Sequence, residues 1–245
     1  MCIRDSSGVD LIVAVSSPAI RAAENATSTI PIVMLSGTDP VAGLFVASLT
    51  HPDGNVTGLS TYVPELAGKR LEVMRECMPD LKRVAILANL RNPSSAVEVK
   101  EMEGAGRTQS IEIHVQDARL PEQYPDAFAA IARGGWRALV VTADPVLSSN
   151  RERIVQLAAR HRLPTMYEWK EIVEIGGLMS YGPSLAEVNG RVAIYVDKIL
   201  KGASPASLPV ERPTRFELAV NLKTAATLGI KVPAPLVARA DRVVK

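Results

Sequence analysis

Small polar residues followed by a proline come directly after apolar runs at three points of the chain, which read Ser16-Ser17-Pro18, Thr38-Asp39-Pro40 and Thr142-Ala143-Asp144-Pro145. A hydroxyl or carboxylate before a proline suits the start of a helix, whose free N–H groups and dipole favour an anion. Ser16 and Ser17 can therefore hold a ligand carboxylate, and Asp39 or Asp144 can accept from a ligand ammonium group. Ordinary capping of the helix that follows is the alternative at each turn.

Other polar residues follow predicted strands in the same way. Asn89 comes directly after the apolar run Val84–Ala88, and its amide can both donate and accept. Tyr181 ends another apolar run and offers an aromatic face and a hydroxyl, with burial in the core as the alternative. Tyr167, Glu168 and Trp169 follow another strand and could line a ligand cleft, although the sequence favours a surface position for Glu168.

Signatures of catalysis and of cofactor binding are absent from the sequence. It contains no G-x-S-x-G, no G-x-G-x-x-G and no G-x-x-x-x-G-K-[ST], and none of its three histidines lies at metal-ligand spacing from another histidine or from a cysteine. We therefore expect neither an enzyme nor a bound metal or cofactor. A formal net charge of +2 without a basic run argues against a nucleic-acid partner. No apolar stretch reaches the roughly 20 residues that span a bilayer.

Short apolar runs alternate with helical patterns along the whole chain. Leu11–Val15 and Ile32–Leu35 are too continuous for one-sided strands, so we predict an α/β protein with parallel sheets and helices on both faces. Two such series predict two lobes with a cleft between them. The spacing of apolar residues predicts a helix from Pro40 to Leu49, and Gly58 predicts the close approach of another backbone or a ligand. Cys77 is expected to be a packed core thiol, without a disulfide to Cys2.

Several longer motifs resemble one known family. They read DLIVAVSSPA, STIPIVMLSGTDPV, HPDGNVTGLS, ELAGKRLEVMRE, RVAIL, GGLMSYGP and YVDKILKGASPASLPVERPTRFELAVNLKTAATLGIKVP. In content and order they resemble the ABC-transporter substrate-binding proteins of the tryptophan/tyrosine-type uptake family, which have type I periplasmic-binding-protein folds. The resemblance covers Val9 to Val244. One departure is the Ser16-Ser17 pair, which replaces a Gly-Thr pair common in the family.

The resemblance implies a periplasmic or extracellular protein, with a lipid anchor as one option. Two lobes would close around a small amino-acid-like solute, aromatic in some relatives, and deliver it to a membrane permease and ATPase. The implied lobes are 8–60 plus 183–202 and 61–182 plus 206–245. A ligand-sensing module of a signalling receptor with the same fold is the alternative. The positions that match the family's cleft are Ser16, Ser17, Thr38, Asp39, Asn89, Asp144 and Tyr181.

The beginning of the chain is unusual for this family. MCIRDSS lacks targeting character and resembles a translated sequencing-adaptor leader. Family members usually carry an export signal and further strand–helix units before the position that matches Asp10. We therefore expect an open reading frame cut at its 5′ end, with the first units of lobe 1 and the export signal missing.

Overall fold

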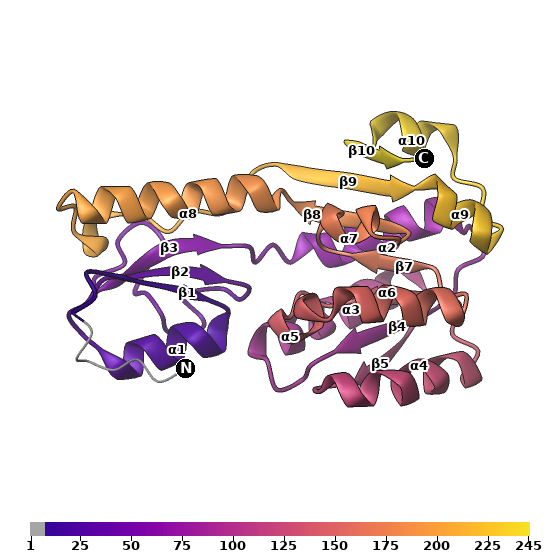
Figure 1. Cartoon of the computed structure of the whole chain (residues 1–245), viewed down its shortest axis with the longest axis horizontal. Helices are drawn as coiled ribbons and strands as arrows, with labels where there is room; N and C mark the ends of the chain where they lie inside the picture. The colour runs from indigo at the N-terminus through magenta and orange to yellow at the C-terminus, as the bar shows by residue number, and fades with distance from the viewer. Residues whose placement is uncertain (1–7) are drawn as a thin grey trace. The chain divides into compact units, whose positions relative to one another are not determined.

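The structure is a computed structural model that describes residues 8–245 and divides into two compact units. Among the described residues, unit 1 contains residues 8–62 together with Leu185–Thr214, and unit 2 contains Val63–Ser184 together with Arg215–Lys245 (Figure 1). Residues 206–214, which the family resemblance places in the second lobe, lie in unit 1. Hydrogen bonds explain this position, because Val210 N donates to Leu49 O at 2.6 Å and Glu211 N donates to Gly58 O at 3.0 Å.

Unit 1 is a three-stranded parallel sheet with a long helix on each face. Its strands, in the order β1-β2-β3, are β1 (Ile12–Val15), β2 (Ile32–Ser36) and β3 (Val56–Ser60). Helix α1 (Ser17–Ala26) packs Ile20 and Ala23 against one face. Helix α8 (Leu185–Leu200) packs Tyr195 and Ile199 against the other (Figure 1). A short 3-10 helix, η3 (Pro205–Ser207), follows α8.

Gly58 lets two strands of this sheet meet closely. It lies opposite Met34 in the parallel pair β2–β3 and has a φ of 134°. A Cβ atom at this position would lie 2.3 Å from the Met34 carbonyl oxygen, which no real side chain tolerates. The prediction that another backbone approaches Gly58 is confirmed.

The predicted helix from Pro40 to Leu49 is wrong. This segment forms turns, in which Gly43 N donates to Asp39 O and Phe45 N donates to Pro40 O. Leu44 has a φ of 56°, which interrupts a right-handed helix, and its side chain is 79% exposed. Phe45 is buried in the core of unit 1 and anchors the loop there. Val46 is buried in the same core and Leu49 packs against it, so the apolar residues anchor a loop rather than form one face of a helix.

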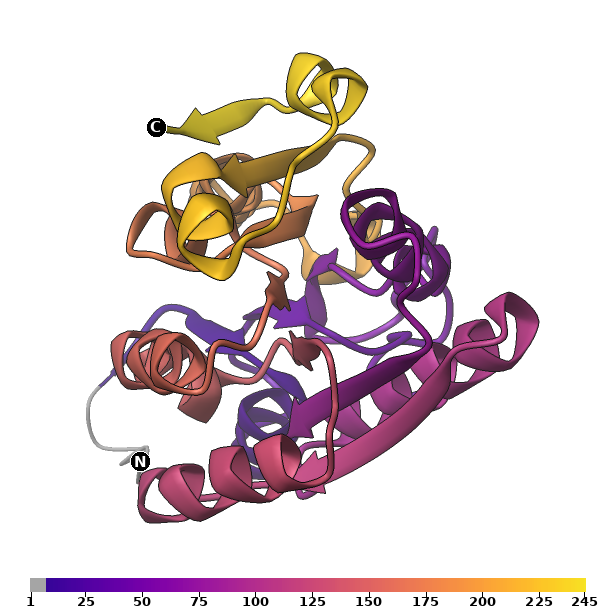
Figure 2. The same cartoon turned by 90° about the vertical axis from the view of Figure 1, so that its right-hand side faces the viewer.

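Unit 2 is a seven-stranded sheet in the order β10-β9-β8-β7-β6-β4-β5, with β10 at one edge and β5 at the other (Figure 2). The strands are β4 (Arg83–Ala88), β5 (Glu112–Asp117), β6 (Leu139–Val141), β7 (Thr165–Tyr167), β8 (Met179–Pro183), β9 (Phe216–Asn221) and β10 (Arg242–Val244). All neighbours are parallel except β8 and β9. That pair corrects the all-parallel expectation: β9 follows a stretch of unit 1, so no crossover helix within unit 2 sets its direction.

Helices cover both faces of the unit 2 sheet. On one face, α2 and α3 pack with the core that contains Leu71, Met74 and Met102, and on the other, α4 and α6 pack with Phe128 and Ile154. The helices are α2 (Glu65–Cys77), α3 (Pro93–Gln109), η2 (Pro121–Gln123), α4 (Tyr124–Arg133), α5 (Pro145–Ser149), α6 (Arg151–Arg160), α7 (Lys170–Glu174), α9 (Leu222–Leu228) and α10 (Ala234–Arg239). Within residues 8–245, no helix has the length and apolar character to cross a bilayer.

Cys77 lies at the end of α2 and is buried among core side chains. Burial raises the pKa of its thiol to about 11, so the thiol stays protonated and unreactive at neutral pH. The prediction of a packed core thiol is confirmed. Cys2 lies outside the described residues.

Candidate functional site

Hydroxyl side chains gather where the three parallel strands of unit 1 end. Ser36 and Ser60 are the last residues of β2 and β3, and Ser17 begins α1 directly after β1. The Thr38 hydroxyl lies 3.1 Å from the Ser17 hydroxyl and 3.1 Å from the Ser36 hydroxyl. The Ser60 hydroxyl donates to the Thr38 carbonyl at 3.0 Å. We call Ser17, Ser36, Thr38 and Ser60 the hydroxyl cluster, and all four residues are buried.

The structure thus brings together two of the predicted residues, Ser17 and Thr38, and adds Ser36 and Ser60. Parallel strands end at the same edge of a sheet, so the last residue of each strand was the signal that could have found the two missed serines. The Ser36 and Ser60 hydroxyls donate to the Thr38 carbonyl, and the Ser17 and Thr38 hydroxyls bond each other. A ligand carboxylate at the start of α1 would therefore have to share hydroxyl donors that are already in use.

Ser16 connects β1 to α1 in an unusual backbone conformation. Its φ is 84° and its ψ is 149°, and its side chain makes no capping hydrogen bond to α1. This region of conformational space is almost restricted to glycine. The resemblance described above places a glycine at this position, so the backbone geometry fits the family's residue better than the serine that is present here.

Asp39 lies in the turn after β2, and both of its carboxylate oxygens have partners. Oδ1 accepts hydrogen bonds from Val41 N at 2.9 Å and from Ala42 N at 3.1 Å. Oδ2 accepts from the Arg212 guanidinium at 2.9 Å. Asp39 therefore caps the turns of residues 40–49 rather than a helix. Sequence reasoning missed Arg212, because 173 residues separate the pair.

Asp144 is 2% exposed and makes four hydrogen bonds. Its Oδ1 accepts from Val146 N at 2.8 Å and from Leu147 N at 3.0 Å, which caps α5. Its Oδ2 accepts from the amide groups of Asn89, at 3.2 Å, and Asn92, at 2.8 Å. The structure therefore brings the predicted pair Asn89 and Asp144 together. Asn92 was missed as a partner, although its position before Pro93 marked it as the cap of α3.

Tyr181 in β8 is held by the core rather than by the other predicted residues. Its ring packs against the unit 2 core that contains Leu71 and Met74, and its centroid lies 6.3 Å from the centroid of the Phe216 ring. Its carbonyl accepts a hydrogen bond from Arg70 Nε at 2.9 Å. Tyr181 is only partly buried and lies at the border of this core.

Glu168 is buried, at 6% exposed, so the expected surface position is wrong. It belongs to what we call the Arg70 cluster, which consists of Arg70, Glu98 and Glu168. Arg70 Nη1 donates to Glu98 Oε1, and Arg70 Nη2 lies 3.9 Å from Glu168 Oε1. Burial raises the pKa of the Glu168 carboxyl to about 7; Arg70 opposes this shift, and the Glu98 charge adds to it. The packing of α2, α3 and β8 around this residue was not visible in the sequence.

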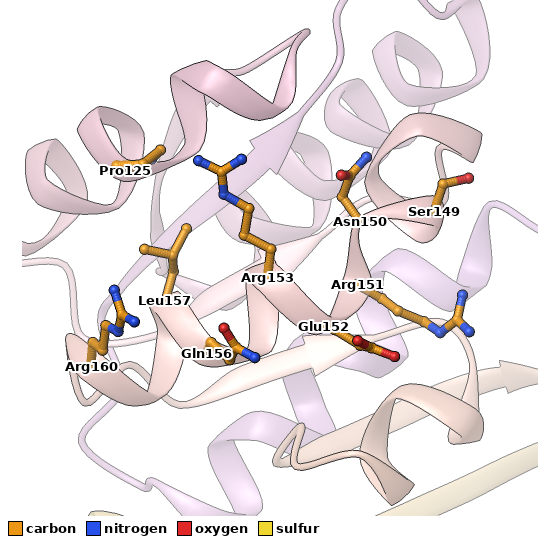
Figure 3. Close-up of a pocket in the computed structure, with 9 residues that line it drawn as sticks. All are labelled: Pro125, Ser149, Asn150, Arg151, Glu152, Arg153, Gln156, Leu157 and Arg160. Carbon is orange, nitrogen blue, oxygen red and sulfur yellow. The ribbon is translucent and has the colours of Figure 1, made fainter.

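A surface groove runs between α4 and α6 of unit 2. Figure 3 shows Arg153 reaching from α6 toward Pro125 of α4, with Arg160 farther along the same helix. The residues that line it are Pro125, Ser149, Asn150, Arg151, Glu152, Arg153, Gln156, Leu157 and Arg160. None of the seven predicted site residues lines this groove, so it is separate from the candidate site.

Comparison with known proteins identifies several relatives. Residues 4–244 match the family model described as ABC transporter substrate binding protein. The curated tyrosine-binding protein of Clostridioides difficile (strain R20291) is 27% identical over 222 residues, which cover 91% of this chain and 64% of that protein. The chain thus spans less than two thirds of the length of this curated relative.

Two solved structures superpose closely on this chain. An ABC domain in complex with L-Trp from Streptococcus pneumonia superposes with a TM-score of 0.88 at 25% identity, covering 98% of this chain and 80% of that chain. A conserved domain protein from Vibrio cholerae superposes with a TM-score of 0.87 at 29% identity, covering 96% of this chain and 78% of that chain. The α/β fold is therefore that of the type I periplasmic-binding proteins. With a family model that matches nearly its whole length, the chain belongs to the ABC transporter substrate-binding protein family.

Proposed function

We propose that this protein is the solute-binding component of an ABC uptake system and that it captures an aromatic amino acid. The observation that carries the proposal is the family match, which extends over residues 4–244. The tyrosine-binding protein and the L-Trp complex among its relatives support an aromatic amino acid as the ligand class. The protein binds its ligand without catalysis, outside the cytoplasm, and passes it to a permease and an ATPase in the membrane.

The hydroxyl cluster of unit 1 supplies the proposed carboxylate contacts. Ser17 and Thr38 present buried hydroxyls at the start of α1, and Ser16 precedes the free N–H groups of the same helix. The positive end of the helix dipole favours an anion at this point. Ser36 and Ser60 orient Thr38, because both hydroxyls bond to its backbone carbonyl at 3.0 Å.

In unit 2, the proposed ligand contacts come from Asn89, which directly follows β4, from Asp144 in the turn after β6, and from Tyr181 within β8. Asp39 in unit 1 and Asp144 in unit 2 are the predicted acceptors for an ammonium group. Each already uses both carboxylate oxygens within its own unit. A ligand amine would therefore have to share an oxygen that has a partner already, which makes both aspartates weaker acceptors than their sequence positions indicate.

A thermal-shift screen tests the proposal. L-tryptophan, L-tyrosine and L-phenylalanine are compared with aliphatic and acidic amino acids. A ligand at 100 times its Kd should stabilise the folded protein by roughly 2.7 kcal/mol. Thr38→Val should remove most of this stabilisation, whereas the matched exchange Thr29→Val, at an exposed position, should leave it unchanged. No stabilisation by any amino acid would refute the assignment.

A further inference from the structure

The carboxylate of Glu168 is buried without the partners that a buried charge needs. Within residues 8–245, no donor hydrogen-bonds to Oε2, and the nearest cation, Arg70, lies 3.9 Å from Oε1. The side chain is only 5% exposed. Leaving a buried charged acceptor unpaired costs free energy, so the missing partner of Glu168 requires an explanation.

Arg70 does not satisfy both carboxylates of its cluster. Its Nη1 bonds directly to Glu98, and its Nε donates to the Tyr181 carbonyl at 2.9 Å. Glu98 Oε2 has a second donor, Ala143 N, at 3.0 Å. One guanidinium charge faces two carboxylates, so with both ionised the cluster carries a net charge of −1, located mainly on Glu168.

Glu168 lies at the carboxyl ends of the parallel strands of the unit 2 sheet, where ligands bind in α/β folds. It directly follows β7, and a small cavity at the ends of β6 and β7 borders it. The cavity has a volume of about 10 Å³, enough for one water-sized group. The polar and aromatic residues that line it with Glu168 are Thr142, Ser148, Arg151, Tyr167 and Trp169, and the rest of the lining is apolar. Only a glycine at position 182 leaves room for Glu168 here, because a Cβ at that position would lie 2.5 Å from the Glu168 carbonyl oxygen and 2.8 Å from its Cγ.

We propose that Glu168 accepts the ammonium group of the ligand and that the protein therefore selects ligands with a protonated amine. This inference rests on the proposed function and deepens it. Glu168 is favoured over Asp39 and Asp144 because its Oε2 is free of partners in the described chain, whereas both oxygens of each aspartate accept hydrogen bonds. Without a ligand, burial keeps the Glu168 carboxyl largely protonated below about pH 7, because it raises the pKa of this group. A primary ammonium group supplies the missing donors and favours the ionised carboxylate, whose charge it neutralises.

Calorimetric titration tests this role with pairs of ligands that differ only in the amine. L-tyrosine is compared with 3-(4-hydroxyphenyl)propionate, and L-tryptophan with 3-(indol-3-yl)propionate. The wild-type protein should bind the preferred amino acid about 30-fold or more tightly than its deaminated partner. Glu168→Gln should lose about 30-fold or more in affinity for the amino acid and less than about threefold for the deaminated acid.

Glu171→Gln is the matched control, because Glu171 Oε2 is also buried without a partner but Glu171 does not line the cavity. It should bind both ligands as the wild type does. Wild-type protein that binds the deaminated acid as tightly as the amino acid overturns the inference without any variant having to fold, and so does a Glu168→Gln variant with unchanged amino-acid affinity. Both results leave the proposed function intact. If the wild type binds no member of either pair, the proposed ligand class fails and the inference fails with it.

Discussion

The Asn92 amide donates a hydrogen bond to Asp144 Oδ2 at 2.8 Å and so joins the turn before α3 to the turn before α5. Asn89 donates to the same oxygen at 3.2 Å, and the other oxygen caps α5. One buried carboxylate therefore holds together the ends of β4 and β6. The turns that follow β4 and β6 therefore depend on the Asp144 side chain for their arrangement.

Asp144→Ala should be strongly destabilising. The change removes the cap of α5 and leaves the buried amides of Asn89 and Asn92 without their acceptor. We expect a loss of about 3 kcal/mol in the free energy of unfolding, measured by urea unfolding followed by circular dichroism. Asp39→Ala is the matched control, since Asp39 also caps a turn before a proline but is partly exposed and should cost about 1 kcal/mol. Equal losses would contradict the assigned role of burial.

Ser16→Gly should stabilise the protein. A serine at φ 84° and ψ 149° is strained, whereas glycine adopts this conformation readily, and the Ser16 side chain makes no capping bond that would be lost. The midpoint of thermal unfolding should rise by an amount equivalent to about 1 kcal/mol. Ser16→Ala keeps the Cβ and should bring no such gain. A higher midpoint for the alanine variant would show that the hydroxyl, not the backbone, carries the strain.

Local sequence patterns were sufficient to locate the strands and the points where they end. The run before Asn89 forms β4, which is buried on both faces. The run before Ser16 forms the edge strand β1, and the predicted burial on both faces is wrong there, because Val13 is 48% and Val15 is 53% exposed. The polar residue that follows each run still marks the end of its strand. Their bonding partners were not predictable, because Arg212 is 173 residues from Asp39 and the pair meets only through the tertiary fold. For Asp39 and Asp144, the sequence alone could not separate capping from ligand binding.

Two other predictions failed for reasons that lie in packing. The spacing of Val41, Leu44 and Phe45 matches a helical face, but only Phe45 is buried, and the left-handed φ of Leu44 turns the chain. Glu168 looked like a surface residue because a charged side chain is rarely buried alone. Its burial depends on Arg70 from α2, 98 positions earlier, which no local pattern reveals.

Gly58→Ala should disrupt unit 1. The new Cβ would lie 2.3 Å from the Met34 carbonyl oxygen and 2.7 Å from its amide nitrogen, both of them backbone atoms in the middle of β2. We expect β2 and β3 to separate, at a cost of more than about 3 kcal/mol, seen as loss of soluble protein and of cooperative unfolding. Gly54→Ala is the control, because no atom lies within 4 Å of its added Cβ. Normal folding of Gly58→Ala would show that the two strands can move apart without penalty.

The stability of the protein should depend on pH through Glu168. Burial raises the pKa of this carboxyl from its ordinary value of 4.5 to about 7, with the Glu98 charge adding to the rise and Arg70 opposing it. Between these pH values the folded state keeps the proton while the unfolded state has released it. The contribution of Glu168 to stability is therefore fully present below about pH 4.5 and is lost as pH rises through about 7.

Glu168→Gln removes this titration, because the amide stays neutral at every pH. The free energy of unfolding of the variant, minus that of the wild type, should therefore increase from pH 5 to pH 7 and level off above about pH 8. Urea unfolding at pH 5, 6, 7 and 8, without ligand, measures the difference, and Glu171→Gln should run parallel to the wild type. A difference that does not change with pH would mean that Glu168 is ionised in the folded protein throughout this range. Arg70 would then compensate for burial more fully than its 3.9 Å distance from Glu168 indicates.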